Sequence, residues 1–348
     1  MQRSHLGRLF RLLRTSAGIT VAVTSLAVAV TGRTVNGLSF DTASPAIAAS
    51  IGLTCAAFVY SGYVEQRTVA RIVRAVFPGG EELRRPLADF ALRVRTTWLR
   101  MWKAIGLMAV SVAAMLYFML LGLGRLDEMG TVSATMFTGP LALSVVGLWK
   151  TGRNRLLGSF LITIASTGLI CLTRPWEGRL DPLGLLFAAT AGAAYAAYFV
   201  AFRRMRRIDE SALGLGSALA TFLGAGLTVT ITGAVLWFSD GMELKGFTPV
   251  REDWLTWRVV GIAAGAALLS NTVALMIQAE VFRRELVTVP AMSILTSLEP
   301  ALGALAGWAI LDQRPIPLDW IGILMVCGAG FACAYLLERG RGATTGDD

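Results

Sequence analysis

The chain has 348 residues, of which 55% are hydrophobic and only 16% are charged, and its formal net charge is +9. The mean hydropathy is +0.61. Soluble proteins carry about 25% charged residues, so much of the apolar surface must face lipid rather than water. The composition also excludes a disordered chain, a collagen-like repeat and a disulfide-stapled secreted fold. We therefore expect an integral membrane protein.

The sequence contains few residues suited to metal or covalent chemistry. Its four cysteines all lie in apolar stretches without CxxC spacing, which indicates packing rather than a zinc site or a disulfide framework. His5, the only histidine, lies in the basic N-terminal tail, so a histidine triad, a histidine-rich metal site and a histidine proton relay are excluded. No ATP-binding motif is present, which argues against a primary pump. We expect no cofactor and no metal.

The apolar stretches are counted next, because a helix needs about 20 mostly apolar residues to cross the bilayer. Nine stretches without Asp, Glu, Lys or Arg reach 18 residues, and a tenth, 286–311, contains one charge, Glu299. The nine are 15–32, 42–64, 104–124, 129–149, 156–173, 182–202, 211–239, 259–279 and 320–337. We expect an all-α integral membrane protein with ten transmembrane helices.

The basic residues predict the orientation. With the N-terminus inside, 24 of the 32 Lys and Arg fall on the cytoplasmic side, as short-loop basic residues do in membrane proteins. We therefore expect a multi-pass cell-membrane protein with both termini cytoplasmic, and the positive charge needs no nucleic-acid partner. An alternative remains at the N-terminus, where Ala27-Val28-Ala29 after an apolar run resembles a signal-peptide cleavage site. Cleavage there would leave nine spans.

Residues 65–103 form the one sizeable region that is not expected to span. Apolar residues at helical spacing, with arginines on the other faces, predict two short amphipathic helices on the inner membrane surface. They are separated by Pro78-Gly79-Gly80. A solvated charged loop is an equal alternative for the first of the two.

The chain shows an internal repeat. A shift of 160 positions brings Ser133, Pro140 and Gly147 onto three residues of the second half, Ser293, Pro300 and Gly307. Five helices in each half would make the copies run in opposite directions, and inverted repeats are typical of secondary transporters. The expected division is a basic tail 1–14, a first five-helix repeat 15–173 containing the linker 65–103, a second repeat 182–337, and a tail 338–348.

Two motifs resemble a known family. The run from Leu298 to Leu302, followed by Gly303, Gly307, Leu311-Asp312 and Gly322, is similar to the last repeat of EamA-type members of the drug/metabolite transporter superfamily. The segments 136–143 and 184–195 resemble the threonine/homoserine exporter subgroup. The resemblance covers roughly 102–337, and it implies export of a small polar metabolite such as an amino acid. The chain departs from the family in having Asp312 where Glu is usual, and in its longer linker.

Two acidic residues are candidates for a proton pathway. Glu299 lies near the centre of its span, where a charge costs about 2.5 to 3.5 kcal/mol. Its functional interpretation is a protonatable carboxylate facing a cavity, and the alternative is a structural glutamate bonded to a neighbouring helix. The subgroup resemblance implies a role for Glu280, although a local ion pair with Arg283 and Arg284 is the stronger interpretation on physical grounds.

Other polar and aromatic residues inside the spans complete the candidate pathway. Asn271 is the one amide well inside its helix, and a buried amide needs partners or substrate. The packing alternative is favoured for the others, because Ser and Thr in membrane helices commonly bond their own backbone. These other candidates are Tyr117, Phe137, Thr138, Tyr195, Tyr198, Ser293, Thr296 and Ser297. The proline segments that contain Gly139, Pro140 and Pro300 are expected to line the cavity.

These features predict a secondary transporter rather than an enzyme. Its partners would be a small-molecule substrate, protons and the bilayer, and the sequence does not indicate an oligomeric state. Transport would proceed by proton-coupled alternating access around a cavity near the midplane. The alternatives are a membrane receptor or scaffold that docks partners on its linker, and a membrane-embedded enzyme acting on lipid, for which no nucleophile, metal cluster or paired acids are evident.

Overall fold

The computed structural model describes residues 44–66, 84–126, 129–150, 155–174, 181–239, 256–268 and 298–342, with a few single positions elsewhere. Within these residues the chain is helical and contains no strand, so the expected all-α class is confirmed. The helices are α2 (Pro45–Val64), α4 (Arg84–Leu126), α5 (Met129–Lys150), α6 (Arg155–Thr173), α7 (Pro182–Ile208), α8 (Leu213–Ser239), α9 (Trp257–Ala267), α12 (Glu299–Leu311) and α13 (Pro317–Gly342).

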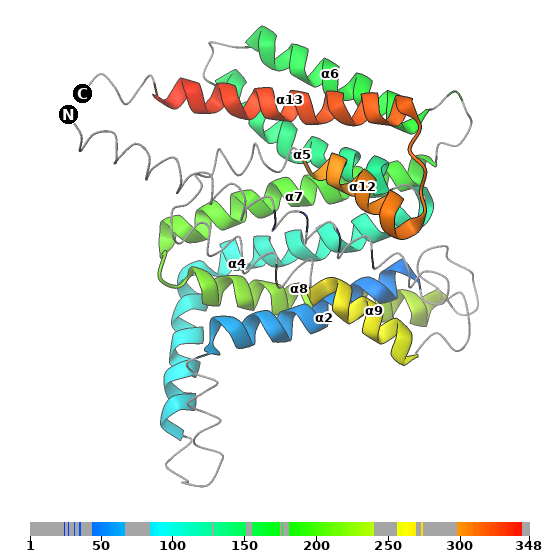
Figure 1. The fold of residues 1–348 in the computed structure, drawn as a ribbon. Helices are drawn as coiled ribbons and strands as arrows, with labels where there is room; N and C mark the ends of the chain where they lie inside the picture. The colour runs from blue at the N-terminus through cyan, green and yellow to red at the C-terminus, as the bar shows by residue number, and fades with distance from the viewer. Residues whose placement is uncertain are drawn as a thin grey trace, which may run out of the picture.

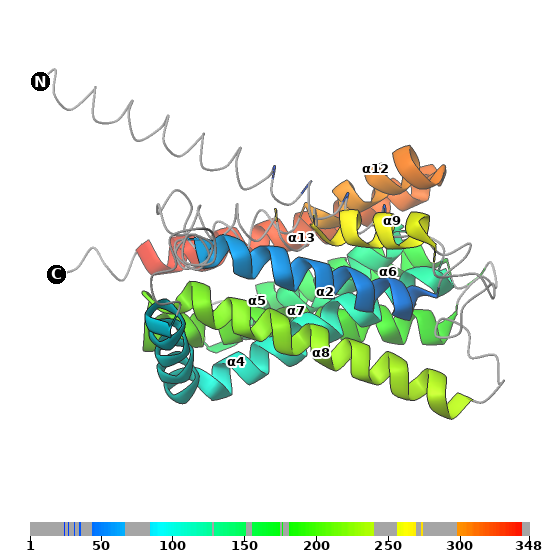
Figure 2. The same ribbon diagram turned by 90° about the horizontal axis from the view of Figure 1, so that it is seen from below.

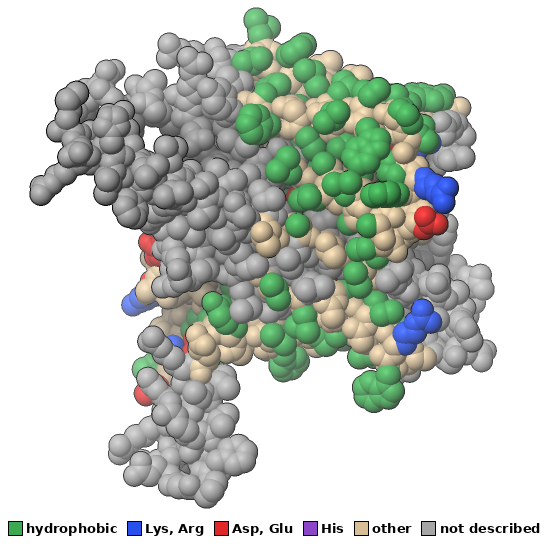
Figure 3. Space-filling view, viewed as in Figure 1, with side chains coloured by type: hydrophobic (Ala, Val, Ile, Leu, Met, Phe, Trp, Pro, Cys, Tyr) green, Lys and Arg blue, Asp and Glu red, His purple; other side chains and the backbone are tan. Residues whose placement is uncertain are grey.

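Five described helices, α2, α4, α6, α7 and α8, are long and apolar enough to cross a bilayer. Helix α5 occupies the predicted span 129–149, and α9, α12 and α13 contain shorter apolar segments. The predicted span 15–32 and large parts of 259–279 and 286–311 lie outside the described residues, so the count of ten stays a prediction. Hydrophobic side chains cover much of the described surface in Figure 3, and the charged ones visible there lie toward its edges.

The helices lie side by side along one common direction (Figure 1). Helix α4 packs against α7 and α8 at the centre, and α5 packs against α7 and α12. Helices α6 and α13 pair at one edge, while α2 packs against α8 and α9 at the other. The bundle has two ends. We call the end where α5 begins the Met129 end and the end where α2 stops the Glu65 end.

Local sequence signals explain several helix starts. Ser44 caps α2, since its hydroxyl accepts a hydrogen bond from the Ile47 N–H at 3.3 Å, and Pro45 follows at the first helical position. Asp181 caps α7 in the same way, with Pro182 next. A polar cap followed by proline satisfies an orphan N–H and presets the backbone angle of the helix. These sites therefore define where α2 and α7 begin.

The described part of the apolar core contains two large clusters and a small one around Ile47 and Val259. The larger joins α2, α4, α5, α7 and α8 and contains fully buried residues such as Leu53, Ile105 and Leu120. The second joins α5, α6, α12 and α13 around residues such as Phe137 and Val326. Helix α5 contributes to both clusters, so it links the two groups of helices.

Helix α4 differs from the expected arrangement of the linker. The second expected amphipathic helix is not separate, because α4 is continuous from Arg84 through the span to Leu126. Nothing in 84–103 breaks a helix once it has started, since Pro86 lies in its first turn. Its first part runs across the direction of the other helices, beside the Glu65 end (Figures 1 and 2). The first expected amphipathic segment lies outside the described residues.

Glycines permit two very close helix crossings. A Cβ at Gly139 of α5 would collide with the Gly192 carbonyl of α7, and a Cβ at Gly192 would collide with the Met136 carbonyl. Gly168 and Gly322 make the equivalent mutual contact between α6 and α13, where each added Cβ would lie within 2.7 Å of the partner's carbonyl oxygen. Small residues let helix backbones approach closely in membranes, where van der Waals packing drives association.

The crossing at Gly192 gives the first prediction. Replacing Gly192 with Ala should force α5 and α7 apart, because the new methyl group would overlap backbone atoms that cannot rotate away. Overpacking of this kind costs roughly 1 to 3 kcal/mol. We expect a lower midpoint of thermal unfolding for the detergent-solubilised protein. Gly226→Ala is the matched control, since no described atom lies within 4 Å of a Cβ at Gly226 in α8; an equal loss in both variants would contradict the close crossing.

Candidate functional site

A buried carboxylate lies at the start of α12. Glu299 is 1% exposed, and the hydroxyl of Tyr195 in α7 donates a hydrogen bond to its Oε1 at 2.8 Å. Tyr195 is itself only 5% exposed. Pro300 follows at the start of the helix and is buried as well. The structure thus brings together three of the predicted pathway residues.

The position of Glu299 within α12 offsets part of the cost of burying its charge. The helix has 13 residues, which gives it a length of about 20 Å, and it begins near the middle of the bundle (Figure 1). The N-terminal end of a helix carries a partial positive charge from its backbone dipoles, which attracts a carboxylate. The hydrogen bond from Tyr195 acts in the same direction.

Aromatic side chains extend along α7 from Tyr195. Tyr195, Tyr198, Phe199 and Phe202 recur at helical spacing, and the rings of Tyr195 and Phe199 have centroids 4.9 Å apart. Tyr198 packs against Phe199 and Phe202 at 5.7 and 6.3 Å. This aromatic row continues from Glu299 toward the Glu65 end, because α7 runs in that direction.

The described contacts of the predicted α5 residues are packing contacts and hydrogen bonds within the helix. Phe137 is 2% exposed and belongs to the cluster with α6 and α13, not to that of Tyr195. The Thr138 hydroxyl donates to the Thr135 carbonyl of its own helix at 2.6 Å. Pro140 has no N–H, so the Met136 carbonyl lacks its usual helical donor. The backbone of Gly192 lies against that carbonyl. The carbonyl affected by Pro140 therefore lies at the same α5–α7 crossing as Gly139.

Tyr117 lies in a separate polar cluster between α2, α4 and α8. Its hydroxyl is 3.0 Å from Thr232 Oγ1, which in turn is 2.9 Å from Ser50 Oγ. All three residues are buried. Sequence reasoning missed Ser50 and Thr232, because hydroxyl residues are common in membrane helices and satisfy themselves on the preceding turn.

Helices α5 and α12 pack closely at the Met129 end. Gly303 lies against Ser133, Ala304 against Gly130, and Gly307 beside Met129. Ascending positions in one helix meet descending positions in the other, so the two helices are antiparallel. Gln313 stabilises this contact in two ways. Its side-chain Oε1 accepts a hydrogen bond from the Met129 N–H at 3.0 Å, and its backbone N–H donates to the Gly307 carbonyl at 3.2 Å.

Two ion pairs hold the same end of the bundle. Arg174, in the left-handed conformation at the end of α6, lies 2.9 Å from Asp319 of α13, and each side chain is 8% exposed. Arg125 lies 3.1 Å from Asp181. Burial acts to raise the pKa of the Asp181 carboxyl, but hydrogen bonds from Arg125, Gly184 and Leu183 outweigh it, so the pKa lies below its ordinary value.

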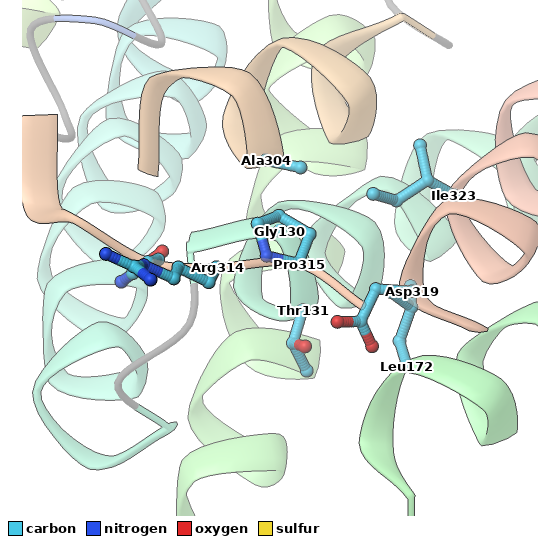
Figure 4. A pocket seen from close by; sticks show the side chains of 9 residues that line it. Gly130, Thr131, Leu172, Ala304, Arg314, Pro315, Asp319 and Ile323 are labelled. Carbon is cyan, nitrogen blue, oxygen red and sulfur yellow. The ribbon is translucent and has the colours of Figure 1, made fainter. Parts of the chain in front are cut away.

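A small cavity opens between these elements (Figure 4). It has a volume of about 40 Å³ and is lined by Gly130, Thr131, Ala304, Gln313, Asp319 and Ile323, among others. One water molecule needs about 10 to 15 Å³ of such space, so the cavity has room for a few water molecules. It lies beside the α5–α12 contact, since Gly130 and Ala304 of that contact are among its lining residues.

The remaining predicted residues are not placed. Ser297, Asn271 and Glu280 lie outside the described residues, as do Ser293 and Thr296. Their roles stay predictions. Among the residues that the structure describes, no group of three or more His, Cys, Asp or Glu side chains is arranged to hold a metal ion.

Gln313, Arg174 and Asp319 were also missed from the sequence. They lie next to span ends, where charged and polar residues are ordinarily assigned to loops. One signal was present: Pro317 and Asp319 occupy the first and third positions of α13, and Asp319 Oδ2 accepts a hydrogen bond from the Ile316 N–H at 2.8 Å. This is the reciprocal half of a capping box.

Comparison with known proteins identifies the second half of the chain. Residues 182–333 match the EamA-like transporter family. The chain carries an EamA-like transporter domain. The resemblance inferred from the two motifs is therefore confirmed, and the chain is a multi-pass membrane transporter.

Individual relatives agree with this assignment. The threonine/homoserine exporter RhtA of Escherichia coli, in strain K12 and in O157:H7, is 24% identical over 233 residues, which is 66% of this chain and 70% of the relative. A crystal structure described only as that of a protein shares the fold, with a TM-score of 0.55 at 15% identity. The match covers 93% of this chain and 98% of the chain in that crystal structure.

The ion pair between Arg174 and Asp319 gives a second prediction. Asp319→Asn keeps an acceptor for the Ile316 N–H but removes the charge facing the buried Arg174 guanidinium. Removing one partner of a buried pair costs roughly 3 to 5 kcal/mol, so we expect thermal unfolding in detergent at a clearly lower temperature. Asp312→Asn is the control, because Asp312 is 87% exposed and lies 3.9 Å from Arg314. Equal midpoints for Asp319→Asn and the unmodified protein would contradict a stabilising pair.

Proposed function

We propose that this chain is a ten-helix secondary transporter that exports a small polar metabolite, an amino acid such as threonine or homoserine, by proton-coupled alternating access. The observation that carries the proposal is the buried Glu299 carboxylate, hydrogen-bonded to Tyr195 at the start of α12. The choice of substrate is supported by relatives that are named as threonine/homoserine exporters.

Glu299 is suited to exchanging a proton for a substrate. A carboxylate in an apolar bundle is costly unless it is neutralised, by a proton or by a cationic group. The ammonium group of an amino acid and a proton would therefore compete for this group. Substrate bound from the Glu65 end would leave when a proton arrives from the Met129 end. Tyr195 would hold the carboxylate in place during both steps.

The antiparallel contact of α5 and α12 supports inverted repeats. The two helices contain the matching prolines Pro140 and Pro300, and they run in opposite directions where they meet. Equivalent helices of two inverted halves have this relation. Each half would then move against the other about the region of Glu299.

The arrangement corresponds to a state closed at the Met129 end. The α5–α12 contact, the bonds of Gln313 and the two ion pairs all lie between Glu299 and that end. Exit on that side would require Gly303 and Ser133 to separate and Gln313 to release Met129. The distribution of basic residues makes the Met129 end the outer one, so the closed state faces the cytoplasm or is occluded.

The two alternatives are less favoured. A receptor or scaffold would not need a buried carboxylate between helices, and the EamA-like domain extends over the region that contains Glu299. A lipid-modifying enzyme would need a nucleophile, a metal or paired acids at one membrane face. The described hydrogen bond to Glu299 comes from a tyrosine, Tyr195.

Replacement of Glu299 by Gln tests the proposal. The variant keeps the size and an acceptor for Tyr195, but it cannot take up or release a proton. In proteoliposomes with an imposed pH gradient, export of labelled threonine and homoserine should fall to the level of empty vesicles. Tyr195→Phe should retain transport but slow it roughly tenfold, since hydrogen bonds to charged groups contribute about 1.5 to 3 kcal/mol.

The control is Asp312→Asn, at an exposed carboxylate beyond the end of α12, and it should transport normally. Gradient-driven transport by Glu299→Gln at the normal rate would refute the proton role. Failure of the unmodified protein to move any amino acid in a broad panel, with its fold intact, would refute the substrate class.

A further inference from the structure

The first part of α4 exposes large apolar side chains beside the bundle. Leu92, Trp98, Leu99 and Trp102 are 60%, 40%, 63% and 52% exposed. Single exposed apolar residues are ordinary, but a contiguous group indicates a contact surface. We call this group, together with Arg95 and Lys103, the outer stripe.

Helix geometry separates the outer stripe from the packed side of α4. With 100° between residues, Leu92 and Leu99 lie two turns apart on one side, and Val110, 55% exposed in the span, continues that side. Another side of α4, which includes the buried Thr97 and Met101, contacts the bundle. The outer stripe therefore lies on a different side of α4 from the buried residues that face the bundle.

Two ion pairs fix the rotation of this part of the helix. Both Arg93 nitrogens donate to the Glu65 carboxylate at the end of α2, at 3.3 and 2.8 Å. Arg100, two turns later on the same side, donates to Asp209 at 3.4 Å. A hydrogen bond from the Ser211 hydroxyl, with a contribution from Arg100, holds the pKa of Asp209 below its ordinary value, so this brace stays charged at neutral pH.

The basic residues of the outer stripe, Arg95 and Lys103, differ from Arg93 and Arg100 in their contacts. Arg95 precedes Leu99 by one turn and Lys103 follows it by one turn, and both are exposed. No described carboxylate pairs with either of them. The Lys103 ammonium instead lies 5.4 Å from the centre of the Trp102 ring. The stripe therefore presents two cations about 12 Å apart along the helix axis, with indole and leucine side chains between them.

The placement of this segment suits the surface of a membrane. It runs across the direction of the spanning helices and beside their Glu65 ends (Figures 1 and 2). That end is the one to which the basic loops of the sequence belong. Tryptophan favours the level of the lipid headgroups, and lysine and arginine beside it attract negative lipids.

We propose that the outer stripe binds anionic phospholipid at the cytoplasmic membrane surface. Trp98, Leu99 and Trp102 contact the acyl chains and glycerol region, while Arg95 and Lys103 contact the phosphate groups. A nucleic acid or an acidic protein would match the two cations but not the apolar residues between them. A lipid matches both, and it is the medium in which the spanning part of α4 already lies.

The experiment measures lipid retained by the full-length protein. The protein, purified in a nonionic detergent, is mixed with equal amounts of phosphatidylglycerol and phosphatidylcholine, and bound lipid is counted by native mass spectrometry. We expect phosphatidylglycerol to be preferred. Arg95→Gln with Lys103→Gln should reduce that preference about 30-fold at low salt, the effect of two basic residues near a charged surface. Trp98→Ala with Trp102→Ala should lower retention of both lipids.

The matched control removes the same charge at the other end of the bundle. Arg258 and Arg314 are exposed there, and their double Gln variant should keep the preference. All variants alter exposed side chains, so an unchanged unfolding midpoint verifies their fold. The proposal is wrong if Arg95→Gln/Lys103→Gln retains phosphatidylglycerol like the unmodified protein, or if the control pair loses as much. Neither result depends on the transported substrate.

Discussion

The need to satisfy every backbone polar group inside lipid governs this structure. A continuous helix meets that need by itself, but α5 contains Pro140 and α12 begins at Glu299 in the middle of the bundle. At the first site the freed Met136 carbonyl lies against Gly192. At the second, the Glu299 carboxylate at the start of α12 accepts a hydrogen bond from Tyr195. The irregular points of the backbone therefore coincide with the closest helix contact and with the buried charge.

The two ends of the bundle are stabilised by different means. At the Met129 end, buried or half-buried pairs such as Arg174–Asp319 join α6 to α13, and Gln313 joins α5 to the end of α12. At the Glu65 end, more exposed pairs such as Arg93–Glu65 brace the first part of α4. Exposed pairs contribute little to stability, whereas breaking a buried pair is costly. Opening the Met129 end therefore needs a compensating gain, which substrate or proton binding at Glu299 could supply.

The sequence predicted the class of fold because hydropathy depends on composition alone. It also singled out Glu299, since one charge within a long apolar run is visible without any contacts. The partner of that charge could not be derived, because Tyr195 lies 104 residues away and only the packing of α7 against its neighbours brings it near. Gln313 and Arg174 were not predicted for a related reason. In the sequence, a polar residue at the end of a span that bridges two helices cannot be distinguished from a polar loop residue. The continuity of α4 was missed because an amphipathic pattern and an apolar pattern adjoin at Lys103 without a helix breaker.

The pairing of α5 with α12 links the backbone constraint to alternating access. These helices carry the two matching prolines, they are antiparallel, and their contact lies between Glu299 and the Met129 end. In the proposed transport cycle, a change of charge at Glu299 would act on the first turn of α12, and the helix would transmit the displacement to Gly303, Ala304 and Gly307. Because these positions have no side chain larger than a methyl group, a shift of a few tenths of an ångström already strains the contact with Ser133 and Met129. In the proposed cycle, close packing would thus convert a local electrostatic event into opening at one end of the bundle.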